Sequence, residues 1–380
     1  MGSSEAYASG ETVENMLDCD VDLDLQKSPS AQAYAELRAQ EHRVTLLPAG
    51  KMFVAQLGES LLDAAARAGI RLPHQCKTGS CGACRAQVLH GPVQDIAGAL
   101  PSALTAEDLA QGQRLLCCSA AAGDLQLECA EIPHIPGIDV RKLPVRVAAM
   151  ERLAPDVMRV QLQPPAGQRL HYAAGQYVDV LLPGNRRRSY SLATPAREGV
   201  DLLELHIRHL RGGLFTDQVF GKLKVRDVLR IEGPFGTFGM HTATDAPAIL
   251  LASGTGFAPI KALVEQLLAA GSGRRITLYW GGRVRQDLYL HDLCKEWEQA
   301  WKGRLTYVPV LSDSPEADGW TGRRGWVHQA VLQDHPDLSQ HEVYACGAPA
   351  MVNAARRDFM ALAGMQSTLF FADAFVAQPG

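Results

Sequence analysis

The sequence predicts a multidomain protein of mixed α+β and α/β class, with a small α+β domain, an antiparallel β-barrel and a parallel α/β domain. Three observations predict this order. Short strands and one helix surround a loop with three cysteines in residues 43–132. Many short strands, separated by Gly and Pro turns, occupy residues 142–240. Apolar strands then alternate with helical periodicity in residues 245–376.

Length and composition narrow the classes of function. A chain of 380 residues, 47% of them apolar, suggests two or three ordinary globular domains. The formal net charge of -4 does not indicate nucleic acid or an anionic membrane as a partner. The nine cysteines do not suggest a disulfide framework, and no stretch of about 18 apolar residues occurs. The first residues lack signal-peptide and myristoylation patterns, so we expect a soluble, cytoplasmic protein.

Residues 1–42 form an acidic segment. Seven carboxylate side chains precede Lys27, the first basic residue. Such composition predicts a flexible extension, with a short helix over residues 31–41. A docking arm for a partner protein is the functional alternative.

Three cysteines in one loop carry the first chemical signal. Cys76, Cys81 and Cys84 have C-x4-C-x2-C spacing, which is typical of a plant-type 2Fe–2S site with a distant fourth cysteine. Gly79 and Gly82 keep the loop small enough to wrap closely around a cluster. The fourth ligand is Cys117 or the adjacent Cys118. A zinc site is the alternative, but zinc favours paired cysteines on both sides and no second pair follows.

The elements around this loop suggest a known fold. We expect strands at 42–47 and 51–55, a helix at 59–69, and strands at 85–89 and 124–129. This arrangement resembles the β-grasp fold of plant-type ferredoxins. In that family the last ligand precedes an aspartate by seven residues, and Asp124 follows Cys117 at this distance. The resemblance therefore implies Cys117 as the fourth ligand. A Pro/Gly-containing linker is expected at 133–141.

The barrel region contains a flavin motif. Arg188, Tyr190 and Ser191 form an R-x-Y-S sequence that follows a G-Q-Y strand at 175–177. Both resemble motifs of the ferredoxin–NADP reductase superfamily. The resemblance implies that the Arg188 guanidinium neutralises a flavin pyrophosphate, that the Tyr190 ring lies on the isoalloxazine and that Ser191 hydrogen-bonds its edge. A solvated basic turn is the alternative for the arginines at 186–188.

A second flavin-binding loop is expected after the next strand. Gly212, Gly213 and Thr216 resemble the family's second phosphate loop, in which backbone N–H groups approach phosphate. Thr216 is expected to cap the following helix. His206, on the strand before this loop, is a further candidate cofactor contact. The family uses FAD as a rule, although these residues do not exclude FMN.

The third region carries nicotinamide motifs of the same superfamily. Gly254, Thr255 and Gly256 begin a G-T-G-x-x-P turn after an apolar strand, where glycines let a pyrophosphate lie against the backbone. Cys346 and Gly347 belong to a C-G-x-P-x-M segment. The resemblance implies that this cysteine lies beside the nicotinamide. The alternative is a small buried residue at the end of a strand.

Two further residues are assigned by position. Arg283 lies where the superfamily reads the 2′-phosphate of NADPH, but it is equally compatible with NADH or with a solvated surface. We expect NADH, with NADPH left open. Phe375 belongs to a tail that resembles the one bringing an aromatic ring over the flavin. A terminal strand that packs Phe370 and Phe371 into the core is the alternative.

Together these resemblances imply an NAD(P)H-dependent oxidoreductase. Electrons would pass from NAD(P)H through FAD and a 2Fe–2S cluster to a partner protein, with Tyr190, Ser191, Cys346 and Phe375 at the reacting groups. The stretches at 188–193, 230–234, 325–332 and 371–375 resemble the CDP-6-deoxy-3,4-glucoseen reductase family, and this resemblance implies a dehydratase partner. A reductase component of a Rieske or di-iron oxygenase is one alternative. A non-catalytic ferredoxin-like redox sensor or binding module is another.

Overall fold

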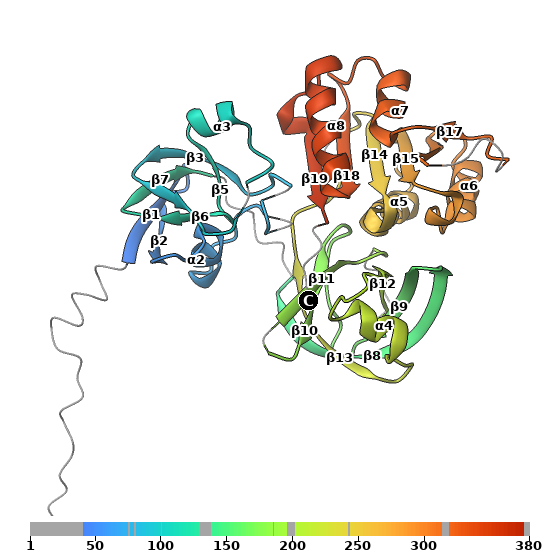
Figure 1. Ribbon diagram of the computed structural model, residues 1–380, viewed down its shortest axis with the longest axis horizontal. Coiled ribbons are helices and arrows are strands. Elements are labelled where there is room, and N and C mark those ends of the chain that lie inside the picture. Colours follow the sequence, from blue (N-terminus) through green and yellow to red (C-terminus); the bar gives the residue numbers. More distant parts are fainter. Residues whose placement is uncertain are drawn as a thin grey trace, which may run out of the picture. The chain divides into compact units, whose positions relative to one another are not determined.

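The computed structural model describes residues 41–74, 77–79, 81–99, 101–129, 138–184, 186–195, 202–241, 244–313 and 319–375. The acidic segment up to residue 40 lies outside the described residues, as does Cys76. So does the helix expected over 31–41, except for Glu41, which begins a strand. The described residues form three main sheets and a two-stranded ribbon (Figure 1).

The first sheet has five strands in the order β2-β1-β7-β3-β5. Strand β1 pairs parallel with β7 and antiparallel with β2, which gives the mixed β-grasp arrangement. Apolar alternation in β1 buries Val44 and Leu46, and Ser60 caps the helix that packs beside the sheet. The elements are β1 Glu41–Leu47, β2 Lys51–Gln56, α2 Leu61–Arg67, β3 Arg85–His90, β4 Val93–Asp95, α3 Ala106–Ala110, β5 Gln113–Leu115, β6 Ser119–Ala121 and β7 Leu125–Glu128.

The second sheet contains six antiparallel strands in the order β11-β10-β13-β8-β9-β12. A bridge between Leu192 and Leu205 joins the chain just beyond β11 to β12, so the two edges of the sheet approach each other. Its inner face is apolar, as the alternating pattern predicts. The elements are β8 Arg141–Ala154, β9 Val157–Gln163, β10 Tyr177–Leu182, β11 Arg186–Ser191, β12 Leu203–Arg208, α4 Thr216–Gly221 and β13 Val228–Phe235.

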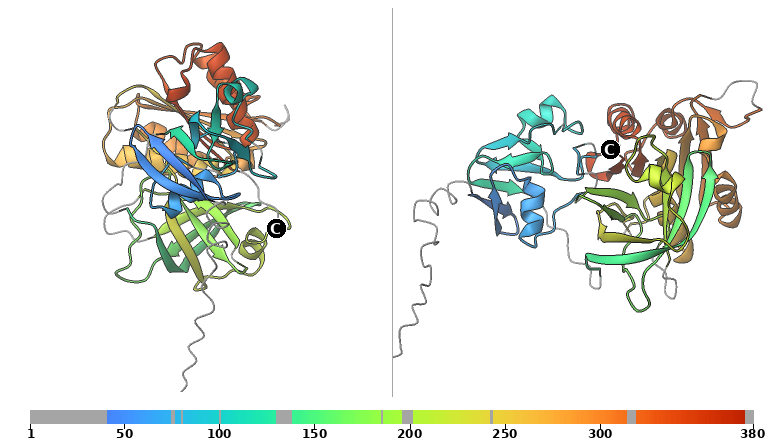
Figure 2. Two further views of the ribbon diagram at one scale, coloured as in Figure 1. Left: turned by 90° about the vertical axis from the view of Figure 1, so that its left-hand side faces the viewer. Right: turned by 60° about the horizontal axis from the view of Figure 1, so that its bottom comes forward.

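The third sheet is entirely parallel, with the order β17-β16-β15-β14-β18-β19. Helices α5 and α6 cover one face and α7 and α8 the other (Figure 2). The elements are β14 Ala248–Ser253, α5 Phe257–Ala269, β15 Ile276–Gly282, α6 His291–Ala300, β16 Leu305–Leu311, β17 Arg323–Arg324, α7 Val327–Asp334, β18 Glu342–Gly347, α8 Pro349–Leu362 and β19 Phe370–Ala374; short 3-10 turns are η1 Gly254–Gly256, η2 Arg285–Asp287 and η4 Ser367–Leu369.

The strand order of the third sheet positions a site. Successive strands run outward from β14 through β15 to β16, and the chain then returns to place β18 on the other side of β14. The order therefore reverses between β14 and β18. In open parallel sheets, ligands bind beyond the carboxyl ends of the strands at such a reversal. These ends are Ser253 and Gly347.

The expected fold class is confirmed for all three regions. In the described part of the chain, no helix combines the length and the apolar character needed to cross a bilayer.

Candidate functional site

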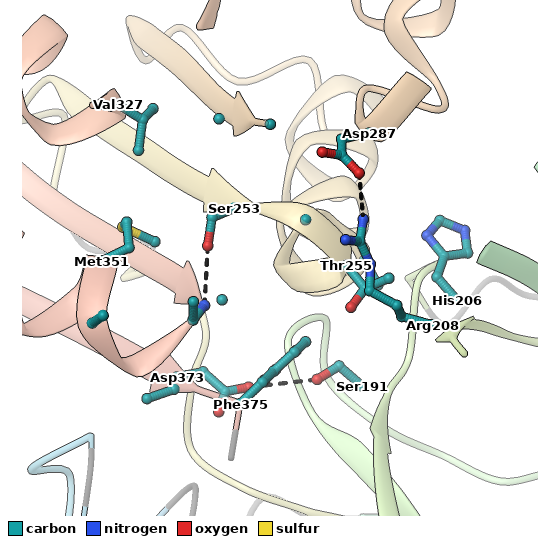
Figure 3. Close-up of a pocket in the computed structure, with 18 of the residues that line it drawn as sticks. Ser191, His206, Arg208, Ser253, Thr255, Asp287, Val327, Met351, Asp373 and Phe375 are labelled. Atoms are coloured by element: carbon teal, nitrogen blue, oxygen red, sulfur yellow. Dashed lines mark hydrogen bonds and ion pairs between the residues drawn. The ribbon is translucent and has the colours of Figure 1, made fainter. Parts of the chain in front are cut away.

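One cavity of about 890 Å³ gathers many of the expected residues (Figure 3). Its volume is in the range of small-molecule and cofactor sites. The barrel, the carboxyl ends of the parallel strands and the cysteine loop all contribute to its wall. The predicted residues that line it are Arg188, Tyr190, Ser191, His206, Gly213, Thr216, Gly254, Thr255, Arg283, Gly347 and Phe375.

Strand β11 supplies the part of the wall expected to contact a flavin. The Tyr190 ring lies 5.6 Å from the ring of Phe215, centroid to centroid, and burial raises the pKa of Tyr190 far above its ordinary value. The tyrosine therefore offers an apolar face with a protonated hydroxyl. The Ser191 hydroxyl donates to Oδ2 of Asp373 at 3.4 Å, which ties β11 to β19 (Figure 3).

Adjacent arginines of β11 have different surroundings. Arg187 forms ion pairs with Glu232 and Asp179. Arg188 lines the cavity, and its Nη1 donates to the Arg187 carbonyl at 2.8 Å. Side chains alternate along a strand, so only one of the two neighbours can face the cavity. A positive guanidinium in this wall is suited to an anionic ligand group.

The second phosphate loop differs in detail from the expectation. Gly213 lines the cavity, whereas Gly212 is absent from the part of its wall that the structure describes. The amide of Gly212 donates to Asp217 and that of Gly213 to the Leu210 carbonyl.

The expected capping role of Thr216 is wrong. The helix begins at Thr216 itself, and the N-cap, Phe215, makes no side-chain cap. The Thr216 hydroxyl instead accepts from the Leu210 amide at 3.2 Å and donates to the Leu210 carbonyl at 2.8 Å. These two hydrogen bonds connect the two ends of the loop between Leu210 and Thr216.

His206 belongs to a buried network between the barrel and α5. Its ring nitrogens lie 3.1 Å from Glu204 Oε1 and 3.1 Å from the Tyr289 hydroxyl, and Lys261 lies 3.2 Å from the same carboxylate. Burial lowers the pKa of His206. For Glu204, burial opposes the charged form, but His206 and Lys261 outweigh it and lower the pKa to about 2. The network fixes the position of His206 at the cavity wall.

Close backbone packing joins the carboxyl ends of β14 and β18. A Cβ added to Gly256 would lie 2.3 Å from the Cys346 carbonyl oxygen, and one added to Gly347 would lie 2.2 Å from Ser253 Oγ. Ser253 Oγ also accepts from the Ala348 amide at 3.0 Å (Figure 3). Gly256 itself is buried and is not among the described residues that line the cavity. A glycine is therefore needed at position 256 so that the turn can pack against the backbone of Cys346.

Cys346 is fully buried in the core and is not among the described residues of the cavity wall. Burial raises the pKa of its thiol, and the charge of Asp373 raises it further. The expected position of Cys346 beside the nicotinamide stays a prediction. The environment of Cys346 fits the alternative of a small buried residue at the end of a strand. Phe375 does line the cavity, and its amide donates to the Gly347 carbonyl at 2.8 Å.

Arg283 lies at the exposed rim of the cavity. Its amide donates to Asp287 at 2.8 Å, and its guanidinium lies 3.4 Å from Asp313 with the side chain 79% exposed. Arg208 also pairs with Asp287, at 3.2 Å (Figure 3). The exposed pair of Arg283 with Asp313 contributes little to the stability of the fold.

Sequence reasoning missed several residues of the wall as individual candidates. Asp373 lies inside the tail motif that singled out Phe375, so the motif offered a signal. Arg208 carries no motif that could have found it, whereas Trp326 lies in the 325–332 stretch that resembles the reductase family and so offered a signal. Thr78, from the cysteine loop, also lines the cavity.

The cysteine loop is described in part, because Cys76 lies outside the described residues. Cys81 and Cys84 are buried, and Cys84 Sγ lies 3.3 Å from Cys117 Sγ. Cys118 Sγ is 3.6 Å from Cys117 Sγ; Cys118 is buried, as Cys81 and Cys84 are, whereas Cys117 is partly exposed.

In the described residues, no three His, Cys, Asp or Glu side chains surround a single metal position. A two-iron cluster instead needs two separate thiolate pairs, and Cys84 with Cys117 fits one of them.

Three known domain families match the chain in this order. Residues 44–122 match the 2Fe-2S iron-sulfur cluster binding domain, residues 144–240 the oxidoreductase FAD-binding domain and residues 250–357 the oxidoreductase NAD-binding domain. A CDP-6-deoxy-L-threo-D-glycero-4-hexulose-3-dehydrase reductase of Yersinia pestis is 40% identical over 333 residues, which cover 88% of this chain and 98% of the relative. The chain belongs to the iron–sulfur flavoprotein reductases of the ferredoxin–NADP reductase superfamily.

Other relatives of the reductase serve oxygenases. Reductase component 1 of a Comamonas terephthalate 1,2-dioxygenase is 34% identical over 340 residues, 89% of this chain and 98% of that one. Among solved structures, the Amycolatopsis cytochrome P450 reductase GcoB is 32% identical, with a TM-score of 0.69 over 88% of this chain and 99% of that chain. A ferredoxin reductase of carbazole 1,9a-dioxygenase shares the fold, with a TM-score of 0.63 and 24% identity over 88% and 98% of the two chains.

The reductase is therefore an NAD(P)H-dependent oxidoreductase that uses FAD and a 2Fe–2S cluster, with NADH as the nicotinamide its domain supports. The cavity residues fit this cofactor set. A positive side chain, an apolar aromatic face and a glycine turn at the start of α5 meet in one space of sufficient size.

Proposed function

We propose that this reductase supplies electrons from NADH to a dehydratase that deoxygenates a nucleotide-linked hexose. The single observation that carries the electron path is the wall of the 890 Å³ cavity, to which Thr78 of the cysteine loop, Tyr190 of the barrel and Thr255 of the parallel sheet all contribute. The acceptor is inferred from the Yersinia pestis relative, which is named for such a dehydrase and is 40% identical over 98% of its length.

The chain's residues bind and orient in this proposal. When bound, FAD accepts a hydride from NADH and passes single electrons to the 2Fe–2S cluster. Arg188 provides positive charge for the pyrophosphate, and Gly213 and Thr216 shape the loop beside it. Tyr190 and Phe375 offer aromatic faces, while Ser191 and its partner Asp373 provide polar atoms at the cavity wall.

The cluster ligands in this proposal are Cys76, Cys81, Cys84 and Cys117. The 3.3 Å separation of the Cys84 and Cys117 sulfurs supports one pair on one iron. The Ala83 amide donates to Cys81 Sγ at 3.4 Å, the type of contact that tunes a cluster's potential.

The nicotinamide donor lies, in this proposal, along Gly254 and Thr255 with Gly347 opposite. These residues are at the strand-order reversal, and the turn begins α5, where backbone N–H groups favour phosphate. Arg283 already faces the Asp313 carboxylate at 3.4 Å, and a carboxylate repels a 2′-phosphate. This arrangement supports NADH over NADPH.

A second candidate acceptor is an oxygenase component. The Comamonas relative and GcoB are 34% and 32% identical over 89% and 88% of this chain, compared with 40% for the Yersinia pestis relative. Because the relatives are reductases, the alternative of a non-catalytic sensor is not carried forward.

Location and docking complete the proposal. We place the reductase in the cytoplasm because a chain with nine cysteines and two thiolate pairs for iron suits a reducing compartment. Cell fractionation tests the proposed location.

Residues 1–40 of the acidic segment lie outside the described residues. The segment's proposed aid to acceptor docking predicts a higher KM for the acceptor after truncation.

The deciding experiment is an anaerobic absorbance titration of purified reductase with NADH, with NADPH in parallel. We expect flavin bands and a broad red shoulder that bleach together with NADH, and a weaker response to NADPH. The acceptor is then tested by turnover with a purified nucleotide-sugar dehydratase, with a Rieske oxygenase component as the comparison. A flavin spectrum without the shoulder in protein purified without air would contradict the cluster. Faster turnover with the oxygenase would favour the second acceptor.

A further inference from the structure

Arg356 of α8 reaches the cysteine loop. Its Nη2 donates to the carbonyl oxygen of Cys81 at 2.7 Å. Its Cζ lies 4.8 Å from the centroid of the Phe370 ring, a cation–π distance. The arginine therefore joins the parallel α/β domain to the backbone of a proposed cluster ligand.

This guanidinium lacks a carboxylate partner. Its Nε is buried and has no hydrogen-bond acceptor in the described part of the chain, and no ion pair there includes Arg356. The nearby Asp108 is already paired with Arg85 at 2.9 Å. A guanidinium stays protonated at neutral pH, so this buried side chain carries a positive charge.

The loop is shaped to admit this charge. Gly82 has φ +76, and a Cβ added to it would lie 3.4 Å from both terminal nitrogens of Arg356. Cys81 and Ala83 pack in the same apolar cluster as Val352 and Ala355 of α8. The loop thus makes polar and apolar contact with one helix face.

A buried charge is costly unless an opposite charge lies near it. Arg356 is not paired by any described carboxylate, and the group expected beside Cys81 is an iron–sulfur cluster bound by thiolates, which is negative overall. A bound cluster that takes one electron from reduced FAD would have one ferric ion reduced to ferrous, with no bond broken, and would become more negative by one charge. The guanidinium charge would then interact more favourably with the loop.

We propose that Arg356 is a positioning residue that supplies the counter-charge of the cluster: it holds the cysteine loop on α8 and favours the reduced cluster. This inference rests on the proposed cluster ligands. Because linkage is reciprocal, the contact that favours reduction is itself strengthened by reduction. Arg356 would therefore favour both electron transfer to the cluster and docking of the reduced loop.

The first test measures the midpoint potential of the cluster by a spectroscopically monitored redox titration. For Arg356→Gln we expect a decrease in the equilibrium constant for reduction of about tenfold, which corresponds to ~59 mV for one electron. Arg304→Gln is the matched control, because Arg304 is exposed and this substitution removes the same charge. An Arg356→Gln cluster with the potential of the parent protein overturns the proposal.

The second test needs no variant. Hydrogen exchange is followed in the parent holoprotein, oxidised and dithionite-reduced, at the amides of residues 81–85 and 354–358. We expect slower exchange in the reduced state, and equal exchange in both states overturns the proposal even if Arg356→Gln loses its cluster. A parent protein without a cluster spectrum contradicts the proposed function itself. A normal cluster with unchanged potential and exchange contradicts this inference alone.

Discussion

The Sγ atoms of Cys84 and Cys117 lie 3.3 Å apart, although 33 residues separate them in the chain. The Arg85 amide and the Leu116 amide hold the two segments in place: Arg85 bonds Gly82, and Leu116 donates to the Cys84 carbonyl at 3.0 Å. The sulfur of the next residue, Cys118, lies 3.6 Å from that of Cys117. Of the two, Cys117 is partly exposed and Cys118 is buried, and Cys117 is the one whose sulfur contacts Cys84.

The first prediction concerns this pair. Cys117→Ser should abolish the 2Fe–2S signal but retain the flavin, because a hydroxyl is a poor replacement for a thiolate ligand. NADH–ferricyanide activity should survive, while cytochrome c reduction should fall. Absorbance and EPR spectra of the reduced protein measure the cluster directly.

Cys118→Ser is the matched control. It should keep the cluster and lower the free energy of unfolding by about 1–3 kcal/mol, because it buries a hydroxyl in an apolar core. Loss of the cluster in Cys118→Ser but not in Cys117→Ser would show that the fourth ligand is misassigned.

The second prediction tests the bond between Ser191 and Asp373. Ser191→Ala and Asp373→Asn should each slow flavin reduction by NADH about tenfold, the effect of losing one hydrogen bond to a charged group. Stopped-flow absorbance measures the rate, with FAD content determined for each variant. Because the two groups act through one contact, the double variant should be no slower than about the slower single variant. Multiplying effects would instead indicate independent roles.

The third prediction concerns Gly256, where an added Cβ would lie 2.3 Å from the Cys346 carbonyl oxygen. Backbone cannot move aside cheaply, so Gly256→Ala should lower the free energy of unfolding by about 2 kcal/mol or more. It should also weaken NADH binding, because the turn must shift. Thermal unfolding and NADH titration measure the two effects. Gly273→Ala has no atom within 4 Å of its Cβ and should be nearly neutral. Equal melting temperatures for the two variants would contradict the steric explanation.

The fourth prediction is a pH dependence of Glu204. Its folded pKa of about 2 is below the ordinary value of 4.5, so its contribution to the free energy of unfolding is fully present above pH 4.5 and is lost as pH falls toward 2. At pH 7, Glu204→Gln should cost about 3 kcal/mol because it breaks a buried pair with Lys261. The difference from the parent should shrink between pH 5 and pH 3 in denaturant unfolding.

His206 adds to the same acid sensitivity. Its folded pKa is lowered by burial, so the unfolded chain binds a proton first and stability falls as pH drops below about 6.5. Glu107→Gln, at an exposed carboxylate, is the control for the Glu204 experiment and should change the free energy of unfolding only slightly. A Glu204→Gln penalty that stays constant down to pH 3 would refute the assigned pKa.

Local sequence predicted the elements of the fold well. Alternation in β1 and β7, glycine turns around the cysteine loop and the apolar run of β14 each specify an element through contacts within a few residues. Most of the cofactor-binding candidates that the motifs named do line the cavity, because spacing within one turn or strand decides which side chains share a face.

Contacts between residues far apart in the sequence could not be predicted from local patterns. No local pattern at Arg208 shows that it lines the cavity, and none shows that Thr216 bonds Leu210 rather than capping its helix. The burial of Cys346 similarly depends on how β14, β18 and β19 pair.

By itself, the sequence determined the three domain types, their order and the chemical groups available to each cofactor, since these follow from local spacing and periodicity. Only the tertiary structure decided which of those groups meet: Ser191 with Asp373, and Arg356 with the Cys81 carbonyl, 275 residues away. The physical reason is that such contacts arise from packing of whole strands and helices, whose free energy is a sum over many distant side chains and is not written in any one motif.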